Sequence, residues 1–128
     1  MTWADWDKAV LALTLWREAR GEGQVGMQAV GCVIRNRVTG ALTYNQVIEK
    51  AWQFSSLTAP GDPMLVQWPV QGDVQFEQAM LLAEGIYLKT VPDITNGATH
   101  YFNPSVVLPK WAASMTKVAS IGHHDFYK

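Results

Sequence analysis

One apolar segment limits what this chain can fold into. Residues 9–16 are apolar at every position except Thr14. The spacing of the apolar side chains predicts a helix over residues 3–19, and a helix that is apolar around most of its circumference is buried on most sides. We therefore expect a central helix, with Thr2 as its N-cap and Asp5 completing a capping box.

The predicted helix ends in a cluster of charge. Residues 17–22 contain two carboxylates and two guanidinium groups, and Gly21 and Gly23 are expected to end the helix as C-terminal glycines. Glu18 lies at the negative end of the helix dipole beside apolar surface, and both surroundings favour the protonated form that a general acid needs. An exposed Glu in a network of ion pairs is the ordinary alternative. Glu22 follows the break and is either an alternative acid or a cap for the next helix.

The rest of the chain predicts further helices and then a small β element. Gly26 and Gly31 are costly inside a helix, so close packing against the first helix would explain them. The expected fold class is mainly α (α+β), as a single domain over residues 1–128. The expected elements are helices over 24–38, 44–51 and 74–89, an irregular stretch over 52–72, a turn over 91–97, β-prone segments over 98–104 and 117–121, and a turn and extension over 122–127.

Composition excludes several classes of protein. The net charge of −1 does not indicate binding to nucleic acid or to a membrane surface. The sequence also has no apolar run of 18 residues that could span a bilayer. The N-terminus has no basic region before an apolar stretch, so we expect no secretory signal. The single cysteine, Cys32, excludes an internal disulfide and falls in an apolar helical pattern, which predicts a packing role.

Six tryptophans in 128 residues is a high number. Such rings serve as stacking platforms in carbohydrate grooves, but for any single tryptophan we favour packing in the core.

The spacing of the acidic residues in the sequence does not single out a second catalytic carboxylate as a partner for Glu18. The available acids are Glu22, Glu49, Asp62, Asp93 and Asp125. An inverting glycosidase needs a second base, whereas a lytic transglycosylase needs only one acid/base. In the second case the C6 hydroxyl of the muramic acid attacks its own anomeric carbon. The absence of a marked partner therefore favours chemistry with a single acid.

Metal chemistry is a rival hypothesis. His100, His123, His124 and Asp125 could act as ligands, and a zinc amidase needs three protein ligands. The chain has no His-Glu-x-x-His pattern, and adjacent histidines in an extended segment are expected to point apart. We therefore expect no metal and no other cofactor.

Five ordered stretches together resemble one family. They cover residues 16–22, 28–38, 52–55, 97–104 and 121–127. The pattern resembles the cell wall hydrolase family typified by the bacterial spore-cortex-lytic enzyme, which also occurs in phage lysis proteins. The resemblance implies a lysozyme-like, mostly helical fold related to lytic transglycosylases. It also implies cleavage of peptidoglycan between N-acetylmuramic acid and N-acetylglucosamine, without a metal.

The resemblance also implies roles for individual residues. The family's catalytic Glu corresponds to Glu18, and its second Glu corresponds to Glu22, in a structural or supporting role. The same comparison implies that Gln53, Phe54 and Ser55 wall the groove, while His100, Tyr101 and His124 lie near the acid. Arg17 departs from the family, which often has a small or uncharged residue at that position.

The function we expect is that of a lytic transglycosylase acting on the glycan strands of peptidoglycan. The alternatives are a hydrolysing muramidase, an N-acetylmuramoyl-L-alanine amidase, and a non-catalytic peptidoglycan-binding module. The expected setting is phage or prophage lysis, with the protein held in the host cytoplasm before its release to the cell wall. A domain of a longer secreted protein is the other setting. We expect a monomer without stable membrane association.

Overall fold

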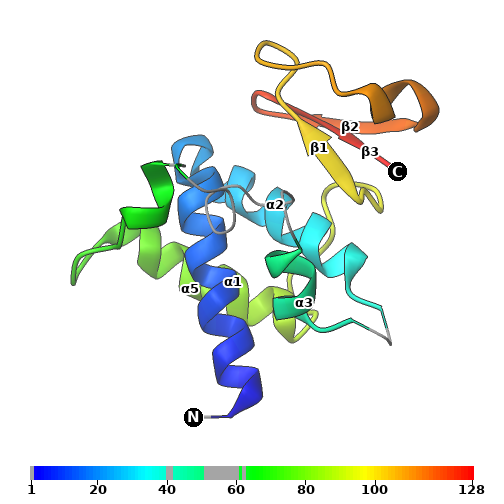
Figure 1. The fold of residues 1–128 in the computed structure, drawn as a ribbon. Coiled ribbons are helices and arrows are strands. Elements are labelled where there is room, and N and C mark those ends of the chain that lie inside the picture. The colour runs from blue at the N-terminus through cyan, green and yellow to red at the C-terminus, as the bar shows by residue number, and fades with distance from the viewer. Residues whose placement is uncertain (1, 40–41, 51–60, 62) are drawn as a thin grey trace.

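The structure is a computed structural model that describes residues 2–39, 42–50, 61 and 63–128. A body of helices carries a small sheet at one end (Figure 1). The helices are α1 (Trp3–Ala19), α2 (Gly23–Arg37), α3 (Tyr44–Glu49) and α5 (Val74–Tyr87), with 3₁₀ segments η1 (Arg20–Glu22), η2 (Pro63–Val66) and η3 (Lys110–Ser114), and the strands are β1 (His100–Phe102), β2 (Lys117–Ile121) and β3 (His124–Tyr127).

The central helix has the predicted bounds and packs against α2, α3 and α5. The predicted capping box is present, since the Thr2 hydroxyl accepts from the Asp5 amide at 3.1 Å and the Asp5 carboxylate accepts from the Thr2 amide at 2.8 Å. Leu11 and Leu15 are fully buried, but Trp3 is 85% exposed, because the first turns of α1 extend past the core. Core packing was therefore the wrong interpretation for Trp3.

The junction between α1 and α2 differs from the prediction. The Arg20 amide closes α1 by donating to the Trp16 carbonyl, and Arg20 itself keeps right-handed helical angles. No left-handed glycine is therefore needed at that point, and the chain continues as the 3₁₀ turn η1. Gly23 has the positive φ of 75° and begins α2.

Helix α2 buries side chains on two of its faces. One face, with Met27 and Ile34, joins the main core formed with α1, α3 and α5. Another, with Ala29 and Val33, packs beneath the sheet. Gly31 is close to α5 as well as to α1, because a methyl group added there would lie 2.0 Å from Ile86 Cδ1 and 3.4 Å from Leu15 Cδ2.

The two other helices begin at the predicted caps. Thr43 and Gln46 form the capping box of α3, and the Asp73 carboxylate accepts from the Phe76 amide at 2.9 Å to start α5. Helix α5 ends at Tyr87, two residues before the predicted end. No helix among the described residues is long and apolar enough to cross a membrane.

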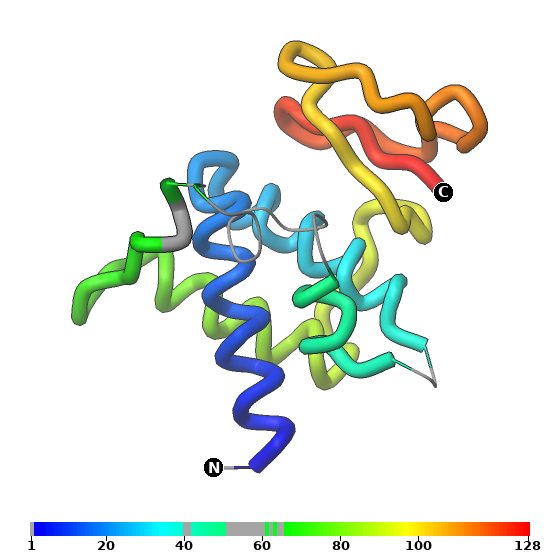
Figure 2. Tube along the Cα trace, in the orientation of Figure 1, coloured from blue at the N-terminus to red at the C-terminus, as the bar shows by residue number. Residues whose placement is uncertain are grey.

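The sheet contains three antiparallel strands in the order β1-β3-β2. Tyr101 pairs with Phe126, and a register irregularity lies between Lys117 and Ala119 in β2. Figure 2 shows the sheet beside the C-terminal end of α1 and over α2, with the C-terminus on its last strand. The buried side chain of Phe126 packs on Ala29 and Val33, and this contact fixes the sheet to the helical body.

Candidate active site

Glu18 and Tyr101 define the place where the helical body meets the sheet. Glu18 lies in the last turn of α1 and is half-buried. Burial and the negative charge of Glu18 hold the pKa of the Tyr101 phenol well above its ordinary value, while Arg37 acts in the opposite direction. The Tyr101 hydroxyl therefore stays protonated beside the carboxylate and is able to donate a hydrogen bond.

Aromatic contacts hold Tyr101 in place. Its ring stacks on Phe126 with centroids 5.7 Å apart, and the His124 ring meets it edge-on at 5.1 Å. Tyr101 also packs against both hydrophobic clusters of the molecule. These contacts orient the Tyr101 ring. That Tyr101 lies near the acid stays a prediction, which the effect of the Glu18 charge on the Tyr101 phenol supports.

Glu22 joins the helical body to the turn between β2 and β3. Its Oε1 lies 2.9 Å from Nδ1 of His123 and 3.8 Å from Nδ1 of His124. A methyl group added at Gly122 would lie 2.7 Å from the other carboxylate oxygen, so the backbone approaches Glu22 closely. Glu22 occupies the N-cap position of α2 but its side chain makes no capping bond, so the capping alternative is wrong.

The two adjacent histidines do not point apart. His123 lies in the turn and only His124 is in the strand, so both rings approach the same Glu22 oxygen. Burial lowers the pKa of His124, Glu22 partly offsets this effect, and His123 adds to it. His124 is therefore biased toward the neutral imidazole beside Tyr101.

His100 precedes Tyr101 in β1 and packs against Trp111. Its Nδ1 lies 3.0 Å from the Thr99 hydroxyl, and its ring lies 4.9 Å from that of Trp111. Burial lowers its pKa, and the cations Arg37 and Lys50 act in the same direction. His100 lines two neighbouring hollows, one of about 370 Å³ against Trp111 and one of about 750 Å³ that reaches α3.

Arg17, the departure from the family pattern, anchors the segment before α5. It is buried, its Nε donates to the Gln67 carbonyl at 3.0 Å, and its guanidinium lies 4.6 Å from the Trp68 ring. Arg20 donates to the Gln67 side chain at 2.6 Å. Sequence patterns did not identify Gln67 and Trp68, because the partners lie about 50 positions away in an irregular stretch.

Two of the other acids considered as partners, Asp93 and Asp125, are held by structural contacts. Asp93 accepts hydrogen bonds within the 93–97 turn and from Asn36, and Asp125 accepts from Ser120 and pairs with Lys117 at 3.3 Å. Glu49 is exposed on α3.

The remaining predicted positions are Asp62, Gln53, Phe54 and Ser55, which lie outside the described residues. Within the described part of the chain, no group of three or more His, Cys, Asp or Glu side chains is arranged to hold a metal ion.

The fold is that of catalytic domains that have been solved from two bacilli. The catalytic domain of the germination-specific lytic transglycosylase SleB from Bacillus anthracis aligns over 100% of this chain and 97% of its own, with a TM-score of 0.73 and 28% identity. The catalytic domain of the Bacillus cereus SleB protein aligns over 95% of this chain and 89% of its own, with a TM-score of 0.74 and 27% identity. The mostly helical, lysozyme-like fold is confirmed by these matches.

Residues 21–127 match the model of the cell wall hydrolase family, and the chain belongs to that family. The spore cortex-lytic enzyme of Bacillus cereus is 32% identical over 122 residues, and that of Halalkalibacterium halodurans is 32% identical over 124 residues. These matches cover 95% and 97% of this chain but only 44% and 35% of the two relatives. The family match begins after Glu18, so the catalytic role of Glu18 stays a prediction from the sequence motif.

Proposed function

We propose that this protein cleaves the bond between N-acetylmuramic acid and N-acetylglucosamine in peptidoglycan, as a lytic transglycosylase with Glu18 as its only acid/base. The observation that carries the proposal is a half-buried Glu18 in the last turn of α1, whose charge acts on the phenol of Tyr101 in the neighbouring sheet and helps to keep that hydroxyl protonated. The solved domain of similar fold is named a lytic transglycosylase, which supports the same chemistry.

The proposed reaction needs one carboxyl group. Protonated Glu18 donates its proton to the glycosidic oxygen as the bond to the anomeric carbon breaks. The resulting carboxylate takes the proton of the muramic acid C6 hydroxyl, whose oxygen attacks the anomeric carbon and closes a 1,6-anhydro ring. Tyr101 donates a hydrogen bond to the N-acetyl carbonyl and holds the sugar during the reaction. Glu18 gives one proton to the leaving oxygen and takes one from the C6 hydroxyl, so it ends in its starting protonation state.

Mass spectrometry of digested peptidoglycan tests this proposal. We expect soluble fragments with 1,6-anhydro ends, and Glu18→Gln should lower their release at least about 10³-fold because no other group supplies the proton. Glu77→Gln is the matched control, since Glu77 is exposed in the first turn of α5. Full activity of Glu18→Gln with an intact fold would overturn the assignment.

The same digest separates the alternative functions. Reducing muramic acid ends would identify a hydrolysing muramidase, and new amino groups without glycan cleavage would identify an amidase. Binding to insoluble peptidoglycan without release of fragments would identify a binding module. The proposed mechanism predicts that a chelator leaves the rate unchanged.

We also propose that the protein acts as a monomer in phage or prophage lysis, reaching the wall from the host cytoplasm. This setting rests on the sequence resemblance alone, which is to a family that is expected to include phage lysis proteins. Expression in a bacterial host with and without a membrane-pore protein tests it. Lysis that requires both the pore protein and Glu18 is the expected result. Light scattering on the purified protein tests the monomer.

A further inference from the structure

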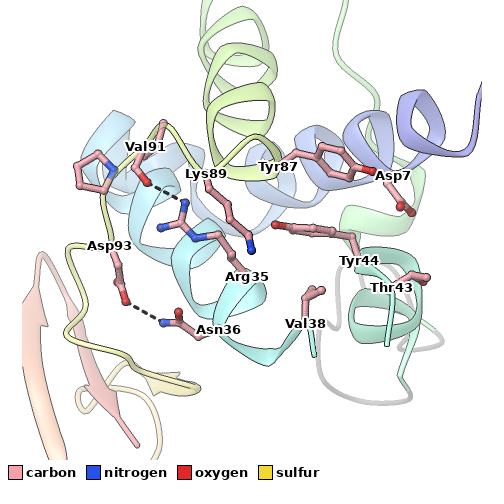
Figure 3. A pocket seen from close by; sticks show the side chains of 11 residues that line it. Asp7, Arg35, Asn36, Val38, Thr43, Tyr44, Tyr87, Lys89, Val91 and Asp93 are labelled. Atoms are coloured by element: carbon pink, nitrogen blue, oxygen red, sulfur yellow. Dashed lines mark hydrogen bonds between the residues drawn. The ribbon is translucent and has the colours of Figure 1, made fainter. Parts of the chain in front are cut away.

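A hollow of about 890 Å³ lies away from Glu18, where the first half of α1, the last turn of α2 and the end of α5 meet (Figure 3). Asp7 marks its edge on α1, eleven residues before Glu18, which is about 16 Å along a helix axis. The charged and aromatic side chains that line it are Asp7, Arg35, Tyr44, Tyr87, Lys89 and Asp93.

One end of the hollow is cationic. Arg35 donates to the Val91 carbonyl at 2.7 Å, and both Arg35 and Lys89 line the hollow (Figure 3). Lys89 forms no ion pair with any described residue. The Asp93 carboxylate nearby is already occupied, since its oxygens accept hydrogen bonds from Thr95, Gly97 and Asn36. The two cations therefore offer a place for an anionic group.

Lys89 occupies a backbone position that normally favours glycine. It follows the C-cap of α5 and has a φ of 62°, in the left-handed region. Its amide donates to the Ile86 carbonyl at 3.1 Å, a bond that glycine would form equally well. A lysine at this position therefore has a higher backbone conformational energy than a glycine would have. Its side chain extends into the hollow. Strained positions of this kind cluster at ligand sites.

The other end of the hollow is acidic and aromatic. The Tyr44 and Tyr87 rings lie 5.3 Å apart at a tilt of 39°. Asp7 is half-buried beside them and forms no ion pair with another described residue. Burial raises the pKa of Tyr44, Arg35 lowers it, and Asp7 raises it, which places this phenol between the cationic and acidic ends.

We propose that this hollow binds a zwitterionic peptide, the peptide stem of peptidoglycan. A carboxylate of the stem lies between Arg35 and Lys89, an ammonium group faces Asp7, and the aliphatic part crosses Tyr44 and Tyr87. This inference rests on the proposed function, because peptidoglycan is the substrate that carries such stems. The hollow holds the wall polymer by its peptides while the groove at Glu18 acts on the glycan.

The probe is the free tetrapeptide L-alanyl-γ-D-glutamyl-diaminopimelyl-D-alanine, titrated into the full chain and followed by NMR. We expect shifts at residues around Lys89 and a Kd of about 1 mM or tighter. Lys89→Gly should weaken binding at least about tenfold and should unfold at the same or a higher temperature, because glycine relieves the left-handed strain. Lys110→Gly, at an exposed lysine of η3, is the matched control and should bind normally.

A second pair of measurements tests the acidic end. Acetylating the amino groups of the tetrapeptide should weaken its binding to the wild type, and Asp7→Asn should show no such difference between the two peptides. No binding at about 10 mM, equal binding by Lys89→Gly, or shifts confined to the Tyr101 side would overturn the proposal.

The two proposals fail separately. Cleavage of glycan strands stripped of peptides depends on Glu18 alone and should be unchanged in Lys89→Gly. Peptide binding without Glu18-dependent cleavage would overturn the proposed function only. Cleavage without peptide binding would overturn this inference only.

Discussion

The Glu22 carboxylate lies 2.9 Å from the imidazole of His123, although 101 positions separate the two residues. This contact ties the turn between α1 and α2 to the turn between β2 and β3, next to the pair of Glu18 and Tyr101. Glu22 is mostly buried whereas His123 is 77% exposed, so the bond positions the sheet more than it stabilises the fold.

Glu22→Gln is expected to lower cleavage of peptidoglycan about tenfold, because a small displacement of the sheet misplaces Tyr101 relative to Glu18. The free energy of unfolding should fall by about 1 kcal/mol or less. Fragment release and urea unfolding measure the two effects. The double variant Glu22→Gln/His123→Gln should be no slower than the single one. A loss as large as that of Glu18→Gln would show instead that Glu22 is itself catalytic.

Tyr101→Phe removes only the hydroxyl on which the Glu18 charge acts. Fragment release is expected to fall roughly 10- to 100-fold, because the hydroxyl no longer holds the substrate. Stability should change by less than about 1 kcal/mol, since the contacts of the ring with Phe126 and His124 remain. Adding Phe102→Tyr to the Tyr101→Phe variant tests whether a hydroxyl elsewhere in the same strand compensates for the lost one, and we expect that it does not. A wild-type rate for Tyr101→Phe would remove Tyr101 from the mechanism.

Arg17→Met tests the anchor of the segment before α5. Methionine keeps the apolar stem but loses the bond to the Gln67 carbonyl and the contact with Trp68. The free energy of unfolding should fall by about 1–2 kcal/mol, and hydrogen exchange should rise first in residues 66–72. Arg20→Met keeps the Arg17 contacts and should show a smaller rise there. Unchanged exchange in Arg17→Met would contradict the anchoring role.

Asp93 makes stability depend on pH in the acid range. Desolvation opposes its ionisation, but hydrogen bonds from Thr95, Asn36 and Gly97 outweigh this and hold its pKa at about 2, below its ordinary value of 3.8. The folded state therefore binds fewer protons than the unfolded state between these values. The stabilising contribution is complete above pH 4 and is lost as the pH falls toward 2.

Asp93→Asn should lower the free energy of unfolding by roughly 2 kcal/mol at pH 7, because an amide nitrogen would face amide donors. The variant should also lose part of the decline between pH 4 and 2. Urea unfolding at pH 7, 4 and 3 measures both effects. Parallel pH curves for the two proteins would contradict this role of Asp93.

Local patterns predicted the helices well because their signals lie within a few residues. The capping box of Thr2 and the caps at Thr43 and Asp73 are each formed within one helical turn, and all three are confirmed. The junction after Ala19 was predicted incorrectly because the Arg20 amide closes α1 without a left-handed glycine.

The candidate site was harder to predict, since its contacts join residues that lie far apart in the sequence. No local pattern shows that His123 and His124 approach one carboxylate, or that Arg17 reaches Gln67 and Trp68. The family motif indicated Glu18 and Tyr101, and only the packing of sheet on helix brings them together. The hollow at Lys89 has no sequence signal, since its strain is visible only in the backbone angles.

Helix α2 makes the sheet and the helical body depend on each other for their stability. The three strands contain three, five and four residues, which is too little to form a stable sheet alone. Their buried side depends on Ala29 and Val33, and the other buried side of the same helix completes the main core. Helix and sheet should therefore fold cooperatively. Substitutions such as Val33→Ala should melt α2 and the sheet in one transition, so that Tyr101 keeps its place in the molecule only while α2 is folded.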